Sequence, residues 1–210
     1  MRRITILLSF LVTLNLLAQI TEITKFPLQD TTQTQYYSSI VEAENGNLLF
    51  FWIESTELKM SKSSDGLTWE DAQVLVSDLA QDKSQLDLAT YKLNNGEIYV
   101  AYRANIEITE YHLITSNNNG ETWNTPTFLI TDPNNASKIS WNAKFSQTDD
   151  NKLWFTFDKN PFYLEYTSLG SSGEWSEIKS LGFLYSEGSI INSGSDLFLI
   201  CLKNGSIVLR

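Results

Sequence analysis

The sequence predicts an all-β protein, a β-propeller built from four-stranded antiparallel blades. Turns that end in tryptophan recur along the chain, with Trp69, Trp123 and Trp175 separated by 54 and 52 residues. A period near fifty residues indicates a repeat architecture. Each full period holds four short stretches typical of strands, and four short antiparallel strands make one propeller blade. The chain is therefore predicted to contain about three and a half blades.

Three related segments, which we call the tryptophan turns, comprise residues 63–69, 116–123 and 168–175. Residues 116–123 read Ser-Asn-Asn-Asn-Gly-Glu-Thr-Trp; the first turn is one residue shorter, and the third lacks both the Asp or Asn and the Thr. Such a turn is closed by Ser, Asp or Asn side chains that bond local backbone N–H groups, by a glycine with positive φ, and by a packed indole. Structural roles are predicted for Ser63, Asp65, Gly66, Trp69, Ser116, Asn118, Gly120, Trp123 and Trp175.

The strands are expected between turn signals such as Asn45-Gly46 and Asn95-Gly96. The first blade spans about residues 36–78, with strands at 37–43, 48–54, 58–63 and 68–76. The second spans about 85–130, with strands at 86–93, 97–103, 110–116 and 122–130. The third spans about 138–180, with strands from 139 and at 153–158, 163–168 and 174–180. The incomplete fourth spans 186–210, with strands from 187 and at 197–202 and 206–209.

The tryptophan turns resemble the Asp-box, or bacterial neuraminidase repeat, of the sialidase-like β-propellers. The resemblance covers residues 36–180 well and the remainder loosely. It implies a six-bladed ring, with these turns on the connection between the third and fourth strands, at the end away from the ligand. Because a closed ring needs more blades than this sequence supplies, we expect the chain to be a fragment of a longer polypeptide. Self-association is the expectation if the chain truly ends at Arg210.

The N-terminus predicts a secretory signal. Residues 1–18 combine a basic start at Arg2 and Arg3 with an apolar run from Ile4 to Leu17, too short and too poorly flanked for a membrane span. The mature protein is therefore expected to be secreted or extracytoplasmic, with no membrane span after cleavage. Residues 19–35 are polar, and they are interpreted as a linker or as a strand that closes the ring.

The composition excludes several classes of partner. A formal net charge of −10 argues against nucleic acid and anionic membranes, which require a basic surface. The single cysteine, Cys201, permits no internal disulfide, and neither it nor the single histidine, His112, has a second residue of its kind with which to share a metal. No metal or cofactor is expected, and His112 is interpreted as an ordinary residue of an edge strand.

In the resembled architecture, ligands bind where first strands start and where second strands lead into third strands. The first group comprises Tyr36, Tyr37, Gln85, Asp87, Trp141, Asn142 and Glu187, and the second comprises Glu54, Arg103, Asn105, Asp158 and Lys159. The catalytic candidates among them are Asp87, Glu187 and Arg103. The candidates for ligand binding are Arg103, Trp141, Tyr37 and Asp158.

Four of these candidates also have a simpler interpretation. Arg103 is interpreted as a surface residue paired with Glu107 or Glu110. Asp87 would bond backbone at a strand start, Glu187 would lie in an ordinary turn, and Trp141 would pack between blades.

The resemblance to sialidases is incomplete at the functional level. A sialidase would need three arginines to bind the sugar carboxylate, because a guanidinium pairs with it in bidentate fashion. After residue 18 the chain has only Arg103 and Arg210. The resemblance implies an early Arg-Ile-Pro motif before the first tryptophan turn, but the nearest segment, Phe26-Pro27-Leu28, has no arginine. We therefore expect a propeller that binds or processes extracellular glycans, and glycoside hydrolysis is the expected reaction if it is an enzyme. The alternative is a non-catalytic extracellular scaffold that binds protein or another cell-surface ligand.

Overall fold

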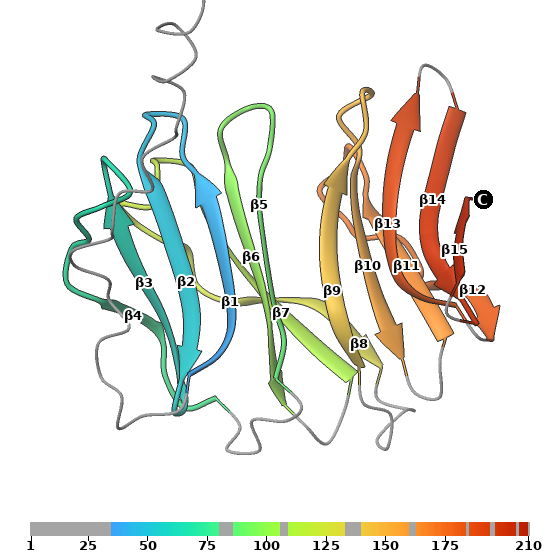
Figure 1. Ribbon diagram of the computed structural model, residues 1–210, viewed down its shortest axis with the longest axis horizontal. Helices are drawn as coiled ribbons and strands as arrows, with labels where there is room; N and C mark the ends of the chain where they lie inside the picture. Colours follow the sequence, from blue (N-terminus) through green and yellow to red (C-terminus); the bar gives the residue numbers. More distant parts are fainter. Residues whose placement is uncertain are drawn as a thin grey trace, which may run out of the picture.

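The computed structural model describes residues 35–79, 86–105, 109–132, 140–159, 163–183, 185–193, 196–204 and 206–209. Its strands form three four-stranded antiparallel sheets and one three-stranded sheet, which stand side by side (Figure 1). This arrangement confirms the predicted β-propeller fold with about three and a half blades. The predicted signal at residues 1–18 and the linker up to residue 34 lie outside the described residues.

Each sheet follows the order of the sequence, from an innermost first strand to an outer last strand. The first sheet contains β1 (Gln35–Glu42), β2 (Leu48–Glu54), β3 (Glu57–Ser63) and β4 (Gln73–Val76). The second contains β5 (Leu88–Lys92), β6 (Ile98–Asn105), β7 (Thr109–Ser116) and β8 (Thr127–Asp132). The third contains β9 (Ser140–Gln147), β10 (Leu153–Lys159), β11 (Tyr163–Leu169) and β12 (Lys179–Phe183). The fourth contains β13 (Tyr185–Ser193), β14 (Asp196–Lys203) and β15 (Ser206–Leu209).

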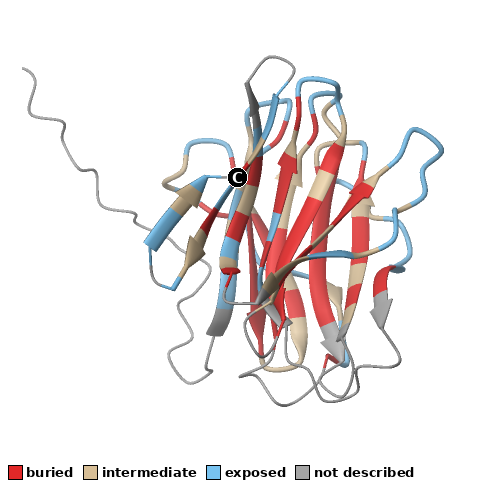
Figure 2. Ribbon diagram, turned by 90° about the vertical axis from the view of Figure 1, so that its right-hand side faces the viewer, coloured by how far each residue is buried: buried red, intermediate tan, exposed pale blue. Residues whose placement is uncertain are grey.

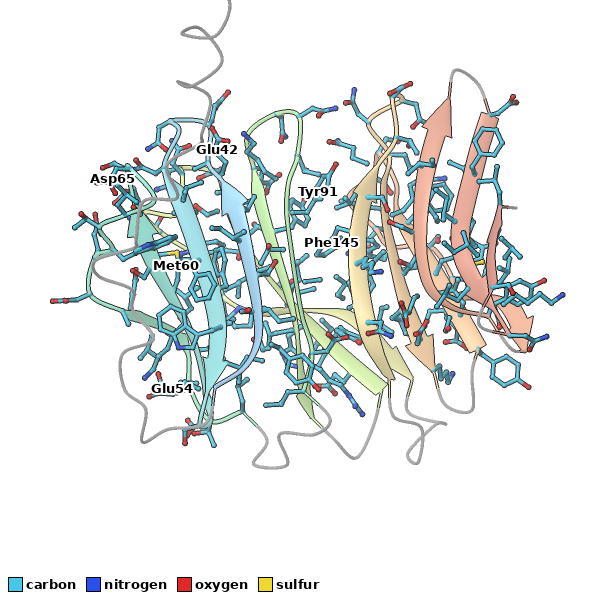
Figure 3. The ribbon with its side chains drawn as sticks, in the orientation of Figure 1. Glu42, Glu54, Met60, Asp65, Tyr91 and Phe145 are labelled. Carbon is cyan, nitrogen blue, oxygen red and sulfur yellow. The ribbon has the colours of Figure 1, made fainter. Side chains whose placement is uncertain are left out.

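The sheets have two different ends. One end, which we call the turn end, carries the tryptophan turns and the hairpins from first to second strands; Figure 3 shows Asp65 and Glu42 there. The opposite end, which we call the lower end, carries the starts of the first strands and the connections from second to third strands, and Figure 3 shows Glu54 there. Those candidate ligand residues that the structure describes lie at the lower end.

Apolar side chains fill the spaces between neighbouring sheets. Alternation along a strand sends Leu49 and Phe51 of β2 toward the second sheet, and Tyr99 and Ala101 of β6 toward the third. Tyr91 and Phe145 belong to the cluster between the second and third sheets, and Figure 3 shows both in that space. The buried residues accordingly concentrate in the middle of the strands (Figure 2). This packing holds the innermost strands β1, β5, β9 and β13 next to one another.

The first two tryptophan turns form closed hydrogen-bonded loops. Asp65 Oδ1 accepts the N–H groups of Leu67 (2.8 Å) and Thr68 (2.7 Å), and Ser63 Oγ accepts the N–H of Gly66 at 2.8 Å. In the second turn, Asn118 Oδ1 accepts the Thr122 N–H at 3.0 Å and Ser116 Oγ accepts the Gly120 N–H at 2.9 Å. Gly66 and Gly120 have φ values of 73° and 78°, which are accessible to glycine at little cost.

The third turn closes differently. By strand register Leu169, and not Ser168, stands where the first two turns have serine. The Leu169 backbone forms an isolated bridge with Trp175. The Gly170 N–H donates to the Glu174 carbonyl at 2.9 Å, so backbone bonds replace the side-chain bonds of the other turns.

The fourth strands begin later than the sequence predicts. The strands expected from residues 68, 122 and 174 begin at Gln73, Thr127 and Lys179. After each tryptophan, one backbone bond connects the chain to the third strand, from Glu70 N–H to Lys62 O in the first sheet and from Asn124 N–H to Thr115 O in the second. Regular pairing then resumes only after a gap, and in the second sheet Pro126 has no N–H to donate.

Candidate functional site

A bulge at the start of the innermost strand recurs at the lower end. In β1, β9 and β13 the pairing with the second strand shifts by one residue, and Tyr37, Asn142 and Glu187 occupy the bulge. Their φ values of 44°, 57° and 53° lie in the left-handed region, which costs a residue other than glycine roughly 1–3 kcal/mol. All three side chains are exposed. The innermost strands lie in the order β1, β5, β9 and β13, so the bulges of β9 and β13 are neighbours, and the bulge of β1 lies beyond β5 on the same edge of the lower end.

Asp87 occupies the corresponding position of the second sheet, but its side chain is buried. Its carboxylate accepts the Leu88 N–H at 2.9 Å, the Tyr111 hydroxyl at 2.7 Å and the Ala143 N–H of the next sheet at 2.9 Å. Burial raises the pKa of Asp87, while these hydrogen bonds and the Arg103 charge act to lower it. Asp87 therefore joins the second and third sheets, in agreement with the backbone-bonding alternative to catalysis.

Asp158 makes the equivalent connection between the third and fourth sheets. Its side chain is 1% exposed and accepts the Glu187 N–H at 2.9 and 3.1 Å and the Asn142 amide at 2.9 Å. Burial raises the pKa of Asp158 to about 6, although the bonds from Asn142 and Glu187 lower it. The carboxylate therefore supports two bulges. The sequence predicts that Asp158 contacts a ligand, but the buried carboxylate could act on a ligand only through the bulge residues Asn142 and Glu187.

Arg103 is buried, so its interpretation as a surface residue is wrong. It lies near the end of β6, on the face that meets the third sheet, and it is 0% exposed. Burial lowers the pKa of its guanidinium, and the neighbouring Tyr111, Asp87 and Tyr37 act in the opposite direction. The alternation of β6 predicts this inward orientation, because Tyr99 and Ala101 point the same way.

Two ion pairs lie near the ends of the second strands. The second strand supplies the acidic residue in one pair and the basic residue in the other. Glu54 accepts a bond from Lys59 at 2.9 Å, and Lys159 pairs with Glu165 at 3.2 Å. These partners lie across one antiparallel connection, so each pair closes the lower end of its own sheet.

The structure brings most of the predicted site residues to one end of the molecule. Tyr37, Asn142 and Glu187 are exposed there, whereas Arg103 and Asp158 lie beneath the surface. Trp141 pairs through its backbone with Asp158, but its side chain lies outside the described part of the chain, as does that of Asn105. Gln85 also lies outside it.

From the sequence, the role of Tyr111 was missed and His112 was misplaced. Tyr111 is fully buried and donates to Asp87, and no motif distinguishes it from other strand aromatics. His112 lies in β7, which pairs with strands on both sides, so the edge-strand interpretation is wrong. The His112 ring contacts Glu110 and packs against Phe128 at 4.8 Å between ring centroids.

Among the described residues, no group of His, Cys, Asp and Glu side chains is arranged to hold a metal ion. That same part of the chain also contains no helix with the length and apolarity of a membrane span.

Gly188, next to the Glu187 bulge, is a position where a side chain does not fit. A Cβ atom there would lie 2.3 Å from Leu164 Cδ2, and the Gly188 carbonyl accepts the Thr156 hydroxyl at 2.7 Å. We expect Gly188→Ala to lower the free energy of unfolding by about 1–3 kcal/mol, because overpacking separates the third and fourth sheets. Urea unfolding should detect it. Gly170→Ala is the matched control, since its Cβ would meet only ordinary contacts of 3.5 Å or more. Equal stability of the two variants would contradict the close approach.

Comparison with known proteins supports the fold at low sequence identity. No known family model matches the sequence, and no curated protein matches it. The structure is similar to the α-L-arabinofuranosidase Arb93A of Fusarium graminearum (TM-score 0.63, 15% identity, 82% of this chain and 57% of that chain). It is also similar to an α-L-arabinanase of Penicillium chrysogenum complexed with arabinobiose (0.58, 13%, 84% and 66%). A third similar structure is the Hadza microbial sialidase Hz136 (0.58, 16%, 83% and 43%).

The chain thus spans 43 to 66% of the length of these three structures. Identities this low establish a shared fold and nothing finer. The four sheets form a β-propeller architecture that these glycan-processing enzymes also have.

Proposed function

We propose that this chain is part of a secreted propeller that binds or processes extracellular glycans at its lower end. The observation that carries the proposal is the repeated bulge that exposes Tyr37, Asn142 and Glu187 from the innermost strands β1, β9 and β13. A phenol, an amide and a carboxylate are suited to sugar hydroxyls, because together they both donate and accept hydrogen bonds. Glu187 is the exposed carboxylate at this edge and is the residue we assign to the tightest contact.

The structural neighbours support a glycan as the ligand. Their names include a sialidase, an arabinanase with bound arabinobiose and an arabinofuranosidase with an iminosugar inhibitor. We further propose that the tryptophan turns are Asp-boxes of the sialidase-like propellers, on the basis of the bonds made by Ser63, Asp65, Ser116 and Asn118. Residues 1–18 are proposed to be removed as a secretory signal, a step that the mass of the mature protein tests.

The buried state of Arg103 favours an uncharged sugar. A sialic acid carboxylate is bound best by exposed guanidinium groups, and Arg103 is the arginine among the described residues. It is 0% exposed and lies in the field of Asp87 and Tyr111. The lower end therefore suits neutral pentose or hexose units better than acidic ones.

The proposal is tested by calorimetric titration with arabinobiose, a set of other neutral oligosaccharides, and sialyllactose. We expect binding of a neutral oligosaccharide and at least about tenfold weaker binding by Glu187→Gln, since a hydrogen bond to a charged group contributes roughly 1.5–3 kcal/mol. Hydrolysis is followed in the same samples by the release of reducing ends. Asp149→Gln, at the exposed turn end, is the control that should bind like the wild type.

Three outcomes would count against the proposal. Preferential binding of sialyllactose would contradict the neutral class, and unchanged affinity in Glu187→Gln would move the site elsewhere. Absence of binding to every oligosaccharide would favour a protein-binding scaffold.

A further inference from the structure

The buried carboxylate of Asp158 lies next to the backbone of the exposed Glu187. Asp158 contacts the backbone of Glu187, not its side chain, through bonds of 2.9 and 3.1 Å from one N–H to both carboxylate oxygens. The Asn142 amide donates to Asp158 Oδ2 at 2.9 Å, so the carboxylate is oriented from the third sheet as well. One acidic group thus connects two of the three exposed bulge residues.

We propose that Asp158 is a positioning residue for Glu187, holding the backbone in the left-handed conformation that directs the Glu187 side chain into the glycan site. This inference rests on the proposed function and identifies how the site is built. Glu187 has a φ of 53°, a conformation that is unfavourable for a residue with a β-carbon unless its surroundings impose it. The bond to Asp158 supplies part of that constraint, and the close packing of Gly188 on Leu164 adds to it.

Comparison of Asp158 with Asp87 distinguishes a residue that positions Glu187 from a residue that only joins two sheets. Asp87 and Asp158 each accept a backbone N–H from the next sheet, at Ala143 and at Glu187 respectively. Only the second of these bonds ends on a residue with an exposed carboxylate. A purely structural carboxylate would stabilise the junction of the sheets without changing the contact between Glu187 and a sugar.

The charged groups around Asp158 come from each of the strands packed against it. Lys144 on β9 lowers the pKa of Asp158 and Glu187 on β13 raises it, while burial is the largest influence and raises it. Lys159, next in β10, is paired with Glu165 of β11. Because the folded-state pKa of about 6 exceeds the ordinary aspartate pKa of 3.8, the folded protein binds a proton more readily than the unfolded chain.

That difference gives a test that needs no glycan. The unfolding free energy of the wild type, measured relative to Asp158→Asn, should rise as the pH falls through about 6 and level off below about 4. Amide hydrogen exchange at Glu187 should be slow in the wild type and in Asp158→Asn, which keeps one acceptor oxygen. It should be at least about tenfold faster in Asp158→Ala, which has none. Slow exchange in Asp158→Ala would overturn the proposal.

The second test is a double-mutant cycle with arabinobiose as the probe. We expect Asp158→Ala to weaken binding by about tenfold, Asp158→Asn by less than about threefold, and the double variant Asp158→Ala/Glu187→Gln to match Glu187→Gln alone. Additive losses would mean that Asp158 acts independently of Glu187, and they would overturn the inference. Asp158→Ser replaces Asp158→Ala if the alanine variant does not fold, because its hydroxyl is too short to reach the Glu187 N–H.

The experiments distinguish failure of the glycan-binding proposal from failure of the positioning role proposed for Asp158. If the wild type does not bind arabinobiose, arabinobiose is not a ligand of the proposed site. Amide hydrogen exchange at Glu187 then decides the role of Asp158. If arabinobiose binds and Glu187→Gln weakens it while Asp158→Ala does not, the site stands and the positioning role is wrong.

Discussion

Replacing Asp87 with alanine is expected to lower the free energy of unfolding by about 3–5 kcal/mol, the usual effect of breaking a buried charged network. The carboxylate accepts three hydrogen bonds, from Leu88, Tyr111 and the Ala143 N–H of the next sheet. It also faces the buried Arg103 cation. Alanine would leave these donors without that acceptor in a region from which water is excluded. Chemical denaturation monitored by far-ultraviolet circular dichroism gives the value.

Two variants show which part of the network matters. Asp87→Asn keeps an acceptor oxygen and loses the charge, so we expect a smaller loss than for alanine. Asp149→Ala, on an exposed turn, should stay within about 0.5 kcal/mol of the wild type. If Asp87→Ala were no more destabilising than Asp149→Ala, the network would not join the second and third sheets as described.

Much of the fold could be predicted because its signals are local. Turn residues such as Asn45-Gly46 and the Ser63 to Trp69 segment fix where strands end, and strand Leu48–Glu54 matches its prediction residue for residue. The fourth strands were harder to predict. Their first residues follow the tryptophan turns, where one backbone bond is made and pairing then lapses, and apolar alternation does not reveal that gap.

The candidate site could be predicted only as a region. The position of Asp87, Asn142 and Glu187 at strand starts follows from the repeat, but the bulges and left-handed φ values of Asn142 and Glu187 depend on pairing between strands. Whether a charged residue is exposed depends on contacts between sheets. Arg103 and Glu187 are both charged, yet one is fully buried and the other exposed, because the third sheet covers Arg103.

Replacing Trp123 with alanine is expected to lower the free energy of unfolding by about 2–4 kcal/mol, somewhat less than for a fully buried aromatic side chain, because the indole is partly buried. The indole packs edge-on against Phe51 of the first sheet, with ring centroids 5.7 Å apart and an interplanar angle of 89°. Its turn also sits closely on that sheet, since a Cβ at Gly120 would lie 2.7 Å from Leu49 Cδ1. The loss would therefore weaken the junction between two sheets, and urea unfolding followed by circular dichroism measures it.

Trp123→Phe is the matched control, because a phenyl ring keeps part of the contact with Phe51 and should recover part of the stability. Trp69→Ala provides a second comparison, since Trp69 packs on Phe50 within its own sheet at 5.9 Å. Amide exchange should then separate the two alanine variants. Trp123→Ala should speed exchange at the junction of the first and second sheets, whereas Trp69→Ala should act within the first sheet. A stability change for Trp123→Ala within experimental error would mean that the tryptophan turn does not anchor one sheet on the next.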